Sequence, residues 1–378
     1  MRVALDISIL HAPRTGIGEY ALQLGRALQK SPELELALFD GLRWRDDFPA
    51  APQPGYGKLS QAVKAILPNA YRVRRQLMQR RFDSGAKRLR PQVYHQPSLW
   101  PLRFDGPTVM TLHDLTHVHY PETQPSDRLR AIEHYLPTAL QQASRILVDS
   151  QFIADEVTHH YGVPRSKLQI APLGVAPRFH PRSEEQLRIR LAAHQLQMHS
   201  YYLCLGTLEP RKNLDLVIAA YLTLPDRIRH RMPLLIIGAR GWRQEQLTKI
   251  PHRAQAHGQI RLLGYEDENC VAELLAGAHA LLFPSRYEGF GLPVLEALAS
   301  GTPVIASDCG AIPEVAEKAA LYMDPDDIDG CRSQMLALLN DDSLQATLRE
   351  QGQQRARQFS WERCAQITVD TYRTAGHF

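Results

Sequence analysis

The sequence predicts an α/β protein of two domains, each with a parallel β-sheet that helices cover on both faces. Three observations lead to this prediction. The chain has 378 residues, and a domain usually contains about 100–200. Short apolar runs alternate with helical patterns in both halves, which is typical of parallel sheets. A segment with two prolines and a glycine, residues 174–181, separates the two series and is typical of a linker.

The first series begins with an apolar run at residues 2–9, which we expect to form a strand. A glycine-containing loop at residues 14–20 follows and leads into apolar residues at helical spacing. A helix is expected around residues 127–142, and further strands at residues 93–95, 108–112 and 145–148. These elements predict an N-terminal domain of residues 1–180.

The second series contains five apolar runs that each end at Gly, Pro or Ser: residues 201–205, 233–238, 260–264, 280–284 and 303–307. Helices are expected between them at residues 213–222, 271–276 and 293–299. This pattern predicts a second doubly wound domain at residues 181–360. The final segment, residues 361–378, is expected to be helical and to pack back on the N-terminal domain.

Composition and cysteine usage indicate a cytoplasmic protein. The five cysteines are scattered, odd in number and without a C-x-x-C pair, which argues against a disulfide framework or a zinc knuckle. The N-terminus has no long apolar region typical of a signal peptide. No run of about 18 apolar residues is present, so no transmembrane helix is expected.

Positive charge gathers in residues 58–90, which hold ten Lys and Arg residues and one acidic residue. One interpretation is a peripheral surface that meets anionic lipid and a lipid-linked acceptor at the inner face of the membrane. The alternative is an ordinary solvated helix pair. Nucleic acid is not an expected partner.

Two carboxylates follow the expected strand at residues 280–284. Glu288 precedes a glycine turn, and Glu296 lies about one turn into the helix that follows. Glycines 289 and 291 allow the backbone to approach a ligand closely. The unpaired N–H groups at the start of a helix favour a phosphate, and carboxylates accept hydrogen bonds from sugar and ribose hydroxyls. The alternative is a helix cap and a solvated helix face.

Two adjacent cations, Arg211 and Lys212, follow the expected strand at residues 201–205 and its terminal Gly206. Open α/β sheets bind ligands at the carboxyl ends of their strands. The two side chains are therefore expected to neutralise a diphosphate and the charge that develops on it as a leaving group. The alternative is two surface cations at a helix start.

Together these residues resemble the retaining glycosyltransferases of family 4. Glu288 and Glu296 match the E-x7-E signature of that family, and residues 211–213 match its R-K-N segment. Residues 16–18 resemble its N-terminal glycine loop, and residues 113–115 its H-D-L segment. Residues 14–20 are most similar to bacterial mannosyltransferases that build O-antigen and similar polysaccharides.

The resemblance implies a GT-B fold with an interdomain cleft, retention of the anomeric configuration, and no cofactor or catalytic metal. It assigns reactive or charge-stabilising roles to His113, Glu288, Arg211 and Lys212, with His113 using a neutral ring nitrogen towards the donor sugar. It places against the donor Gly16, Gly18, Gly206, Tyr265, Phe290, Gly291, Leu292 and Glu296. A D-x-D-like segment at residues 324–327 is interpreted as a helix cap, not a metal site.

The donor expected from the resemblance is GDP-mannose or its 6-deoxy relative GDP-rhamnose, and the acceptor a hydroxyl of a lipid-linked glycan. A UDP-sugar donor stays open, as do a nucleotide-sugar epimerase of the same architecture and a non-catalytic binder. A dinucleotide oxidoreductase is disfavoured, because residues 14–20 lack the full G-x-G-x-x-G pattern.

Overall fold

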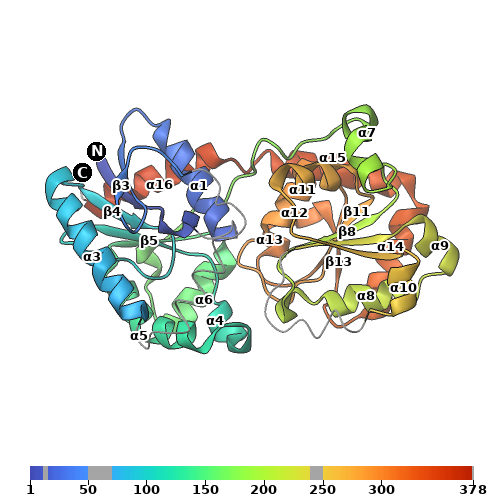
Figure 1. The fold of residues 1–378 in the computed structure, drawn as a ribbon, viewed down its shortest axis with the longest axis horizontal. Coiled ribbons are helices and arrows are strands. Elements are labelled where there is room, and N and C mark those ends of the chain that lie inside the picture. The colour runs from blue at the N-terminus through green and yellow to red at the C-terminus, as the bar shows by residue number, and fades with distance from the viewer. Residues whose placement is uncertain (12–15, 50–69, 239–249, 377–378) are drawn as a thin grey trace. The chain divides into compact units, whose positions relative to one another are not determined.

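The computed structural model describes residues 1–11, 16–49, 70–238 and 250–376, and it forms two compact units (Figure 1). The first comprises Met1–Leu115, Ser126–Gly174 and Ser360–Phe378, and the second Thr116–Pro125 and Val175–Phe359. The boundary therefore falls after Gly174, before the two linker prolines. Residues 116–125 were expected in the N-terminal domain but belong to the second unit, where His119 and Tyr120 pack on the ring of Tyr287.

The first unit contains a seven-stranded sheet in the order β3-β2-β1-β4-β5-β6-β7. Its pairings are parallel except for the short antiparallel pair of β2 and β3. The strands are β1 (Arg2–Asp6), β2 (Glu35–Phe39), β3 (Trp44–Arg45), β4 (Val93–Gln96), β5 (Thr108–Leu112), β6 (Arg145–Val148) and β7 (Leu168–Ile170). The run at residues 2–9 thus ends its strand at Asp6, where a short 3-10 helix, η1 (Ser8–His11), takes over.

Helices cover both faces of this sheet, because successive strand residues point to opposite sides. Leu5 packs with Leu22 of α1, whereas Ala4 packs with Phe82 of α3. The helical elements are α1 (Gly16–Gln29), α3 (Ala70–Leu89), α5 (Ser126–Gln142), α6 (Gln151–Tyr161), η3 (Arg165–Lys167) and α16 (Trp361–Gly376). The C-terminal helix α16 lies against α1 in this unit.

The second unit contains a six-stranded, wholly parallel sheet in the order β10-β9-β8-β11-β12-β13. Its strands are β8 (Tyr202–Leu205), β9 (Leu234–Ile237), β10 (Ile260–Gly264), β11 (Ala280–Phe283), β12 (Val304–Ser307) and β13 (Ala320–Met323). The chain builds outward from β8 in one direction and then returns to β11 and builds in the other. The strand order therefore reverses between β8 and β11, where doubly wound sheets bind ligands.

The helical elements of the second unit are α4 (Thr116–His119), η2 (Pro121–Thr123), α7 (Glu184–Ala193), η4 (Pro210–Lys212), α8 (Leu214–Leu222), α9 (Asp226–Arg231), α10 (His252–Ala256), α11 (Glu268–Gly277), α12 (Leu292–Ala299), α13 (Ile312–Ala316), η6 (Glu317–Ala319), α14 (Ile328–Asn340) and α15 (Asp342–Ala356). The side chain of Asp327 caps α14 by accepting from the N–H of Gly330 at 2.8 Å, which confirms the expected capping role of this loop. None of the described helices is long and apolar enough to cross a bilayer.

Candidate active site

Four charged side chains meet at the point where the second sheet reverses its strand order. Glu209, Arg211 and Lys212 follow β8, and Glu288 follows β11. Lys212 pairs with one oxygen of Glu288, and Arg211 Nη1 lies 3.3 Å from the other. Arg211 Nε lies 2.6 Å from Glu209 Oε1. Two cations and two carboxylates are therefore packed into one nearly buried cluster, with side chains 10–14% exposed.

Hydrogen bonds to backbone carbonyls fix the loops of this cluster. The carbonyl of Arg211 accepts from the N–H of Arg286 at 2.8 Å, and Arg211 Nη1 donates to the carbonyl of Tyr287 at 2.9 Å. Asn213, which ends η4, is in the left-handed region with φ 54° and donates through Nδ2 to the carbonyl of Pro325 at 2.7 Å. The chain after β8 is thus fixed against the chain after β11.

Glu288 is ionised despite its burial. Burial raises the pKa of Glu288, but the nearby Lys212 and Arg211 together lower it by more. The net result is a pKa of about 2. Its backbone is also fixed, because its carbonyl accepts from the N–H of Ala311 at 3.0 Å. Glu288 is therefore charged at neutral pH, whereas burial lowers the pKa of its partner Lys212.

The glycine turn leads directly into helix α12. Gly291 precedes the helix with φ 95°, a left-handed conformation that favours glycine, and no side chain caps the helix start. The first N–H groups of a helix have no acceptor within it, and the helix dipole places partial positive charge there. Phe290, Gly291 and Leu292 thus lie at a backbone site suited to an anion, and Glu296 lies half-buried one turn further along.

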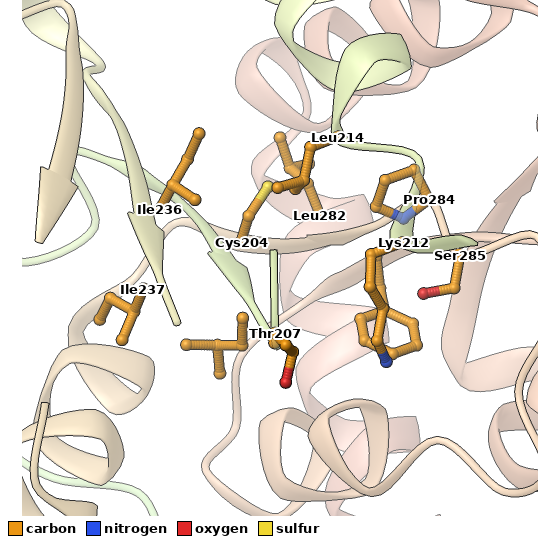
Figure 2. A pocket seen from close by; sticks show the side chains of 12 residues that line it. Cys204, Thr207, Lys212, Leu214, Ile236, Ile237, Leu282, Pro284 and Ser285 are labelled. Carbon is orange, nitrogen blue, oxygen red and sulfur yellow. The ribbon is translucent and has the colours of Figure 1, made fainter. Parts of the chain in front are cut away.

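A small pocket opens between the ends of β8, β9 and β11 (Figure 2). Gly206, Thr207, Lys212 and Ser285 line its polar side. In Figure 2 the Lys212 and Thr207 side chains both extend downward, whereas the apolar side chains of Ile236, Leu214 and Leu282 lie above them. A Cβ atom on Gly206 would lie 3.4 Å from Lys212 Cε, and its φ is 137°. Glycine therefore leaves room for the lysine stem.

The first unit has its own polar group at the carboxyl edge of its sheet. His113 follows β5, and its Nδ1 lies 2.7 Å from Asp149 Oδ2 after β6. Its Nε2 lies 3.2 Å from the carbonyl oxygen of Pro97 after β4. The ring edge packs on Tyr20 of α1, with centroids 4.5 Å apart. Both ring nitrogens therefore face acceptors in this structure, and the expected contact of a neutral ring nitrogen with the donor sugar stays a prediction.

Gly16 and Gly18 begin helix α1 without any left-handed backbone. A Cβ atom added at either position would meet no atom within 4 Å among the described residues. Neither packing inside the unit nor backbone conformation therefore requires glycine at these positions. Open space beside both residues remains consistent with the expected approach of a ligand.

Comparison with known proteins decides the family. The sequence pattern of "Glycosyltransferase Family 4" matches residues 14–179, and that of "Glycosyl transferases group 1" matches residues 192–355. The chain is 34% identical to the O-antigen chain mannosyltransferase B of Escherichia coli, over 99% of this chain and 100% of that protein. The chain belongs to glycosyltransferase family 4.

Solved structures support the fold of this glycosyltransferase. Sucrose-phosphate synthase from Thermosynechococcus elongatus is similar with a TM-score of 0.74 and 20% identity, over 98% of each chain. WaaG, a glycosyltransferase involved in lipopolysaccharide biosynthesis, is similar with a TM-score of 0.73 and 16% identity, over 98% of this chain and 99% of that one. The two doubly wound sheets are those of a GT-B fold.

A more distant relative of the glycosyltransferase is the MMP alpha-(1->4)-mannosyltransferase of Mycolicibacterium hassiacum. It is 29% identical over 62% of this chain and 55% of that protein.

The structure brings together only part of the predicted site. Glu288, Arg211 and Lys212 form one cluster in the second unit, and Gly206 lies beside Lys212. Tyr265 follows the edge strand β10 and is 61% exposed, so its place against a base stays a prediction.

Two residues of these polar groups were missed from the sequence. Glu209 pairs with Arg211, and Asp149 pairs with His113. The sequence did contain a signal for Asp149, because this residue directly follows its strand, β6, just as His113 follows β5. Which strand ends are neighbours, however, is known only from the sheet order.

Proposed function

We propose that this glycosyltransferase moves mannose or a related sugar, such as D-rhamnose, from a GDP-sugar to a hydroxyl of a glycan, with retention of the anomeric configuration. The observation that carries the proposal is the buried cluster of Arg211, Lys212 and Glu288 where the second sheet reverses its strand order. The names of the relatives, an O-antigen chain mannosyltransferase and an α-(1->4)-mannosyltransferase, support the sugar.

The donor diphosphate takes the place of Glu288 at the two cations in this proposal. Arg211 and Lys212 are matched by carboxylates in this structure, and phosphate oxygens form equally strong charge-assisted hydrogen bonds. The exchange frees the Glu288 carboxylate to accept from donor-sugar hydroxyls. The cations then stabilise the charge that builds on the β-phosphate as the bond to the sugar breaks.

The rest of the donor lies along the glycine turn. The N–H groups at the start of α12 receive a phosphate or sugar oxygen, and Glu296 accepts from the ribose hydroxyls. The acceptor hydroxyl attacks from the face that the nucleotide leaves, and the leaving phosphate takes its proton. The product keeps the anomeric configuration, which an NMR spectrum of the new linkage checks.

The reaction needs neither cofactor nor divalent metal in this proposal, because Arg211 and Lys212 supply the positive charge. Turnover in EDTA tests it, and full activity is expected. Loss of activity would contradict the proposal. It would direct attention to His194, Glu266 and Cys270 in the second unit, whose potential ligand atoms lie within 4.8 Å of one another.

A nucleotide panel tests the donor. The melting temperature is measured with GDP, UDP and ADP at equal concentration, because stabilisation by a ligand follows its affinity. GDP is expected to stabilise most. Labelled GDP-mannose is then incubated with a lipid-linked glycan, and label is expected in the glycan. Greater stabilisation by UDP, or an epimerised donor without transfer, would contradict the proposal.

The acceptor is proposed to reach the enzyme at an anionic membrane surface on the cytoplasmic side. Helix α3 turns Phe82 and Gly85 towards the core, whereas Arg80, Arg81 and Lys87 are exposed. Basic residues near anionic lipid contribute about 1 kcal/mol each. Residues 58–69 of the basic stretch lie outside the described residues.

A further inference from the structure

The residues that directly follow three neighbouring strands of the first unit form one polar cluster. β4, β5 and β6 are adjacent and parallel, and the residue directly after each is Pro97, His113 and Asp149 respectively. The register of β5 and β6 pairs Leu112 with Val148, so His113 and Asp149 leave the sheet side by side. The topology itself places an imidazole between a carboxylate and a carbonyl.

Both acceptors facing His113 lack a proton to give. Asp149 is a carboxylate and Pro97 offers a carbonyl oxygen, so each ring nitrogen satisfies its partner only by donating an N–H. A neutral imidazole has one N–H, and an imidazolium has two. The geometry therefore favours the imidazolium.

His95 shows the opposite arrangement one strand away. Its Nδ1 lies 2.7 Å from the hydroxyl of Tyr372 and its Nε2 lies 2.9 Å from that of Thr111. Hydroxyls donate as well as accept, so a neutral ring satisfies both. Burial and the neighbouring His113 together lower the pKa of His95 to about 3. The two nearby histidines thus face hydrogen-bond partners of different kinds.

Asp149 has one hydrogen-bond partner among the described residues, and that partner is His113. Its second oxygen, Oδ1, is buried without a hydrogen bond there, and its side chain is 3% exposed. The cap of helix α6 is supplied by Ser150, whose hydroxyl accepts from the N–H of Ile153. Asp149 is therefore not needed to start the helix, and among the described residues His113 alone compensates its burial by a hydrogen bond.

We propose that Asp149 is a positioning residue that holds His113 as an imidazolium, so that the ring offers a substrate oxygen an N–H and not a lone pair. The Nε2–H, held by the longer contact to Pro97, is the one that exchanges to a substrate oxygen. The protonation state of His113 is inferred from the geometry of the first unit alone. The role of His113 in sugar transfer rests on the proposed function.

The charged surroundings agree with this assignment. Burial lowers the pKa of His113, but the neighbouring Asp149, the Pro97 carbonyl and Asp114 raise it above its usual 6.5. Burial raises the pKa of Asp149 above its usual 3.8, and His113 offsets only part of that rise. Tyr20 packs on the ring from α1, and its own raised pKa keeps it neutral. Asp149 also faces Cys364 of α16, whose burial raises its pKa beyond the physiological range.

Nitrogen NMR of the imidazole rings tests the protonation state without any substrate. The His113 signal is assigned by its loss in His113→Gln. In the wild type the titration midpoint is expected to lie above 6.5, and both ring nitrogens are expected to carry a proton below it. In Asp149→Asn the midpoint is expected to fall, because the carboxylate that favours the charged ring is lost. Asp114→Asn also removes a nearby negative charge but leaves the hydrogen bond between Asp149 and His113 in place. It is therefore expected to shift the His113 midpoint less.

A midpoint at or below 6.5, or a midpoint unchanged in Asp149→Asn, would overturn the proposal. Asp149→Glu keeps a carboxylate at this position and serves as a control for a folding defect. The His113 midpoint in this variant is expected to lie close to that of the wild type. A low midpoint in a folded Asp149→Glu protein would also count against the assignment.

The pH profile of sugar transfer separates positioning from mere structural support. An imidazolium is present below its pKa, so wild-type kcat is expected to fall as pH rises through the raised His113 value. In Asp149→Asn this fall moves to lower pH, and lowering the pH restores part of the activity. A structural defect would not be rescued by acid. If the NMR shift occurs but no GDP-sugar is used, the proposed function fails while the His113–Asp149 pair stands.

Discussion

Glu288 is the residue whose environment departs most from the sequence-based expectation. The signature assigns it to donor-sugar hydroxyls, yet the structure places both carboxylate oxygens against the cations expected to hold the diphosphate. Losing one partner of a buried ion pair is costly, because the other charge is left uncompensated. A ligand that replaces Glu288 at these cations must therefore bring its own negative charge, as a diphosphate does.

The ionised state of Glu288 predicts an acid-sensitive part of the stability. Its pKa is lowered from 4.5 in the ordinary state to about 2 in the fold. A lowered folded pKa contributes stability that is present above the unfolded value and lost as pH falls through the folded value. The free energy of unfolding of the wild type is therefore expected to decline between about pH 4.5 and 2 more steeply than that of Glu288→Gln.

Urea denaturation of both proteins at several pH values measures this difference. Glu317→Gln is a suitable control, because Glu317 is an exposed glutamate of the same unit. Parallel decline of the wild type and Glu288→Gln would show that Glu288 is not held ionised by Arg211 and Lys212.

Individual residues of the site were largely predictable, and their partners were not. Glu288, Arg211, Lys212 and His113 were found because they follow apolar strands in a recognisable pattern. Glu209 and Asp149 were missed, since a pairing between residues 36 positions apart, as for His113 and Asp149, depends on strand order. Sequence spacing alone does not carry that information.

At the scale of elements, the loop after β12 supports the loop after β11. Gly310 follows β12 with φ 61°, and a Cβ atom there would lie 2.5 Å from the carbonyl oxygen of Glu288 and 2.8 Å from its nitrogen. The absence of a side chain at this position lets the two loops touch. The position of Glu288 thus depends on a third strand end.

Gly310→Ala is expected to destabilise the protein and to displace Glu288. The left-handed backbone costs an alanine about 1–2 kcal/mol, and the overlap with the Glu288 backbone adds about 1–3 kcal/mol. Gly264→Ala is the matched control: Gly264 has φ 78°, and a Cβ atom there meets nothing within 4 Å among the described residues.

Unfolding free energies and kcat/KM of the two variants check this prediction. Gly310→Ala should lose more of both, because only it disturbs the loop of Glu288. Equal losses in the two variants would contradict the role given to this contact.

Most strands were predictable from the sequence, including the edge strand β10, and several outer ones were not. The expected runs at residues 108–112, 145–148 and 260–264 form strands with those same bounds. β2, β7 and β13 were not predicted. β7 has no apolar run, because Gln169 interrupts it, whereas the short apolar runs at residues 36–39 in β2 and 320–323 in β13 were missed.

At the scale of the whole molecule, two doubly wound units were expected and found, with a GT-B fold. The boundary lies at Gly174 and Val175 rather than near 180, because the chain leaves the first unit before the prolines. Assignment of residues 116–125 to the second unit was not predictable, since it rests on ring contacts between His119, Tyr120 and Tyr287 that no local pattern shows.

The exposed basic face of α3 predicts binding to anionic membranes. Arg80→Glu with Lys87→Glu is expected to abolish flotation with phosphatidylglycerol vesicles at low salt, at about 1 kcal/mol or more per residue. Arg227→Glu with Arg231→Glu changes the same charge on α9, where both side chains are exposed, and should leave flotation unaffected. The wild type is expected not to float with neutral phosphatidylcholine vesicles. Equal effects of the two pairs would refute a membrane role specific to α3.

The central claim is that Arg211 and Lys212 hold the diphosphate of the donor, and calorimetric titration of GDP and GMP tests it most directly. The wild type is expected to prefer GDP. Lys212→Met should lose about 2–4 kcal/mol of GDP binding and little of GMP binding, whereas Lys318→Met, at an exposed position of the same unit, should bind as the wild type does. An undiminished preference for GDP in Lys212→Met would contradict the account.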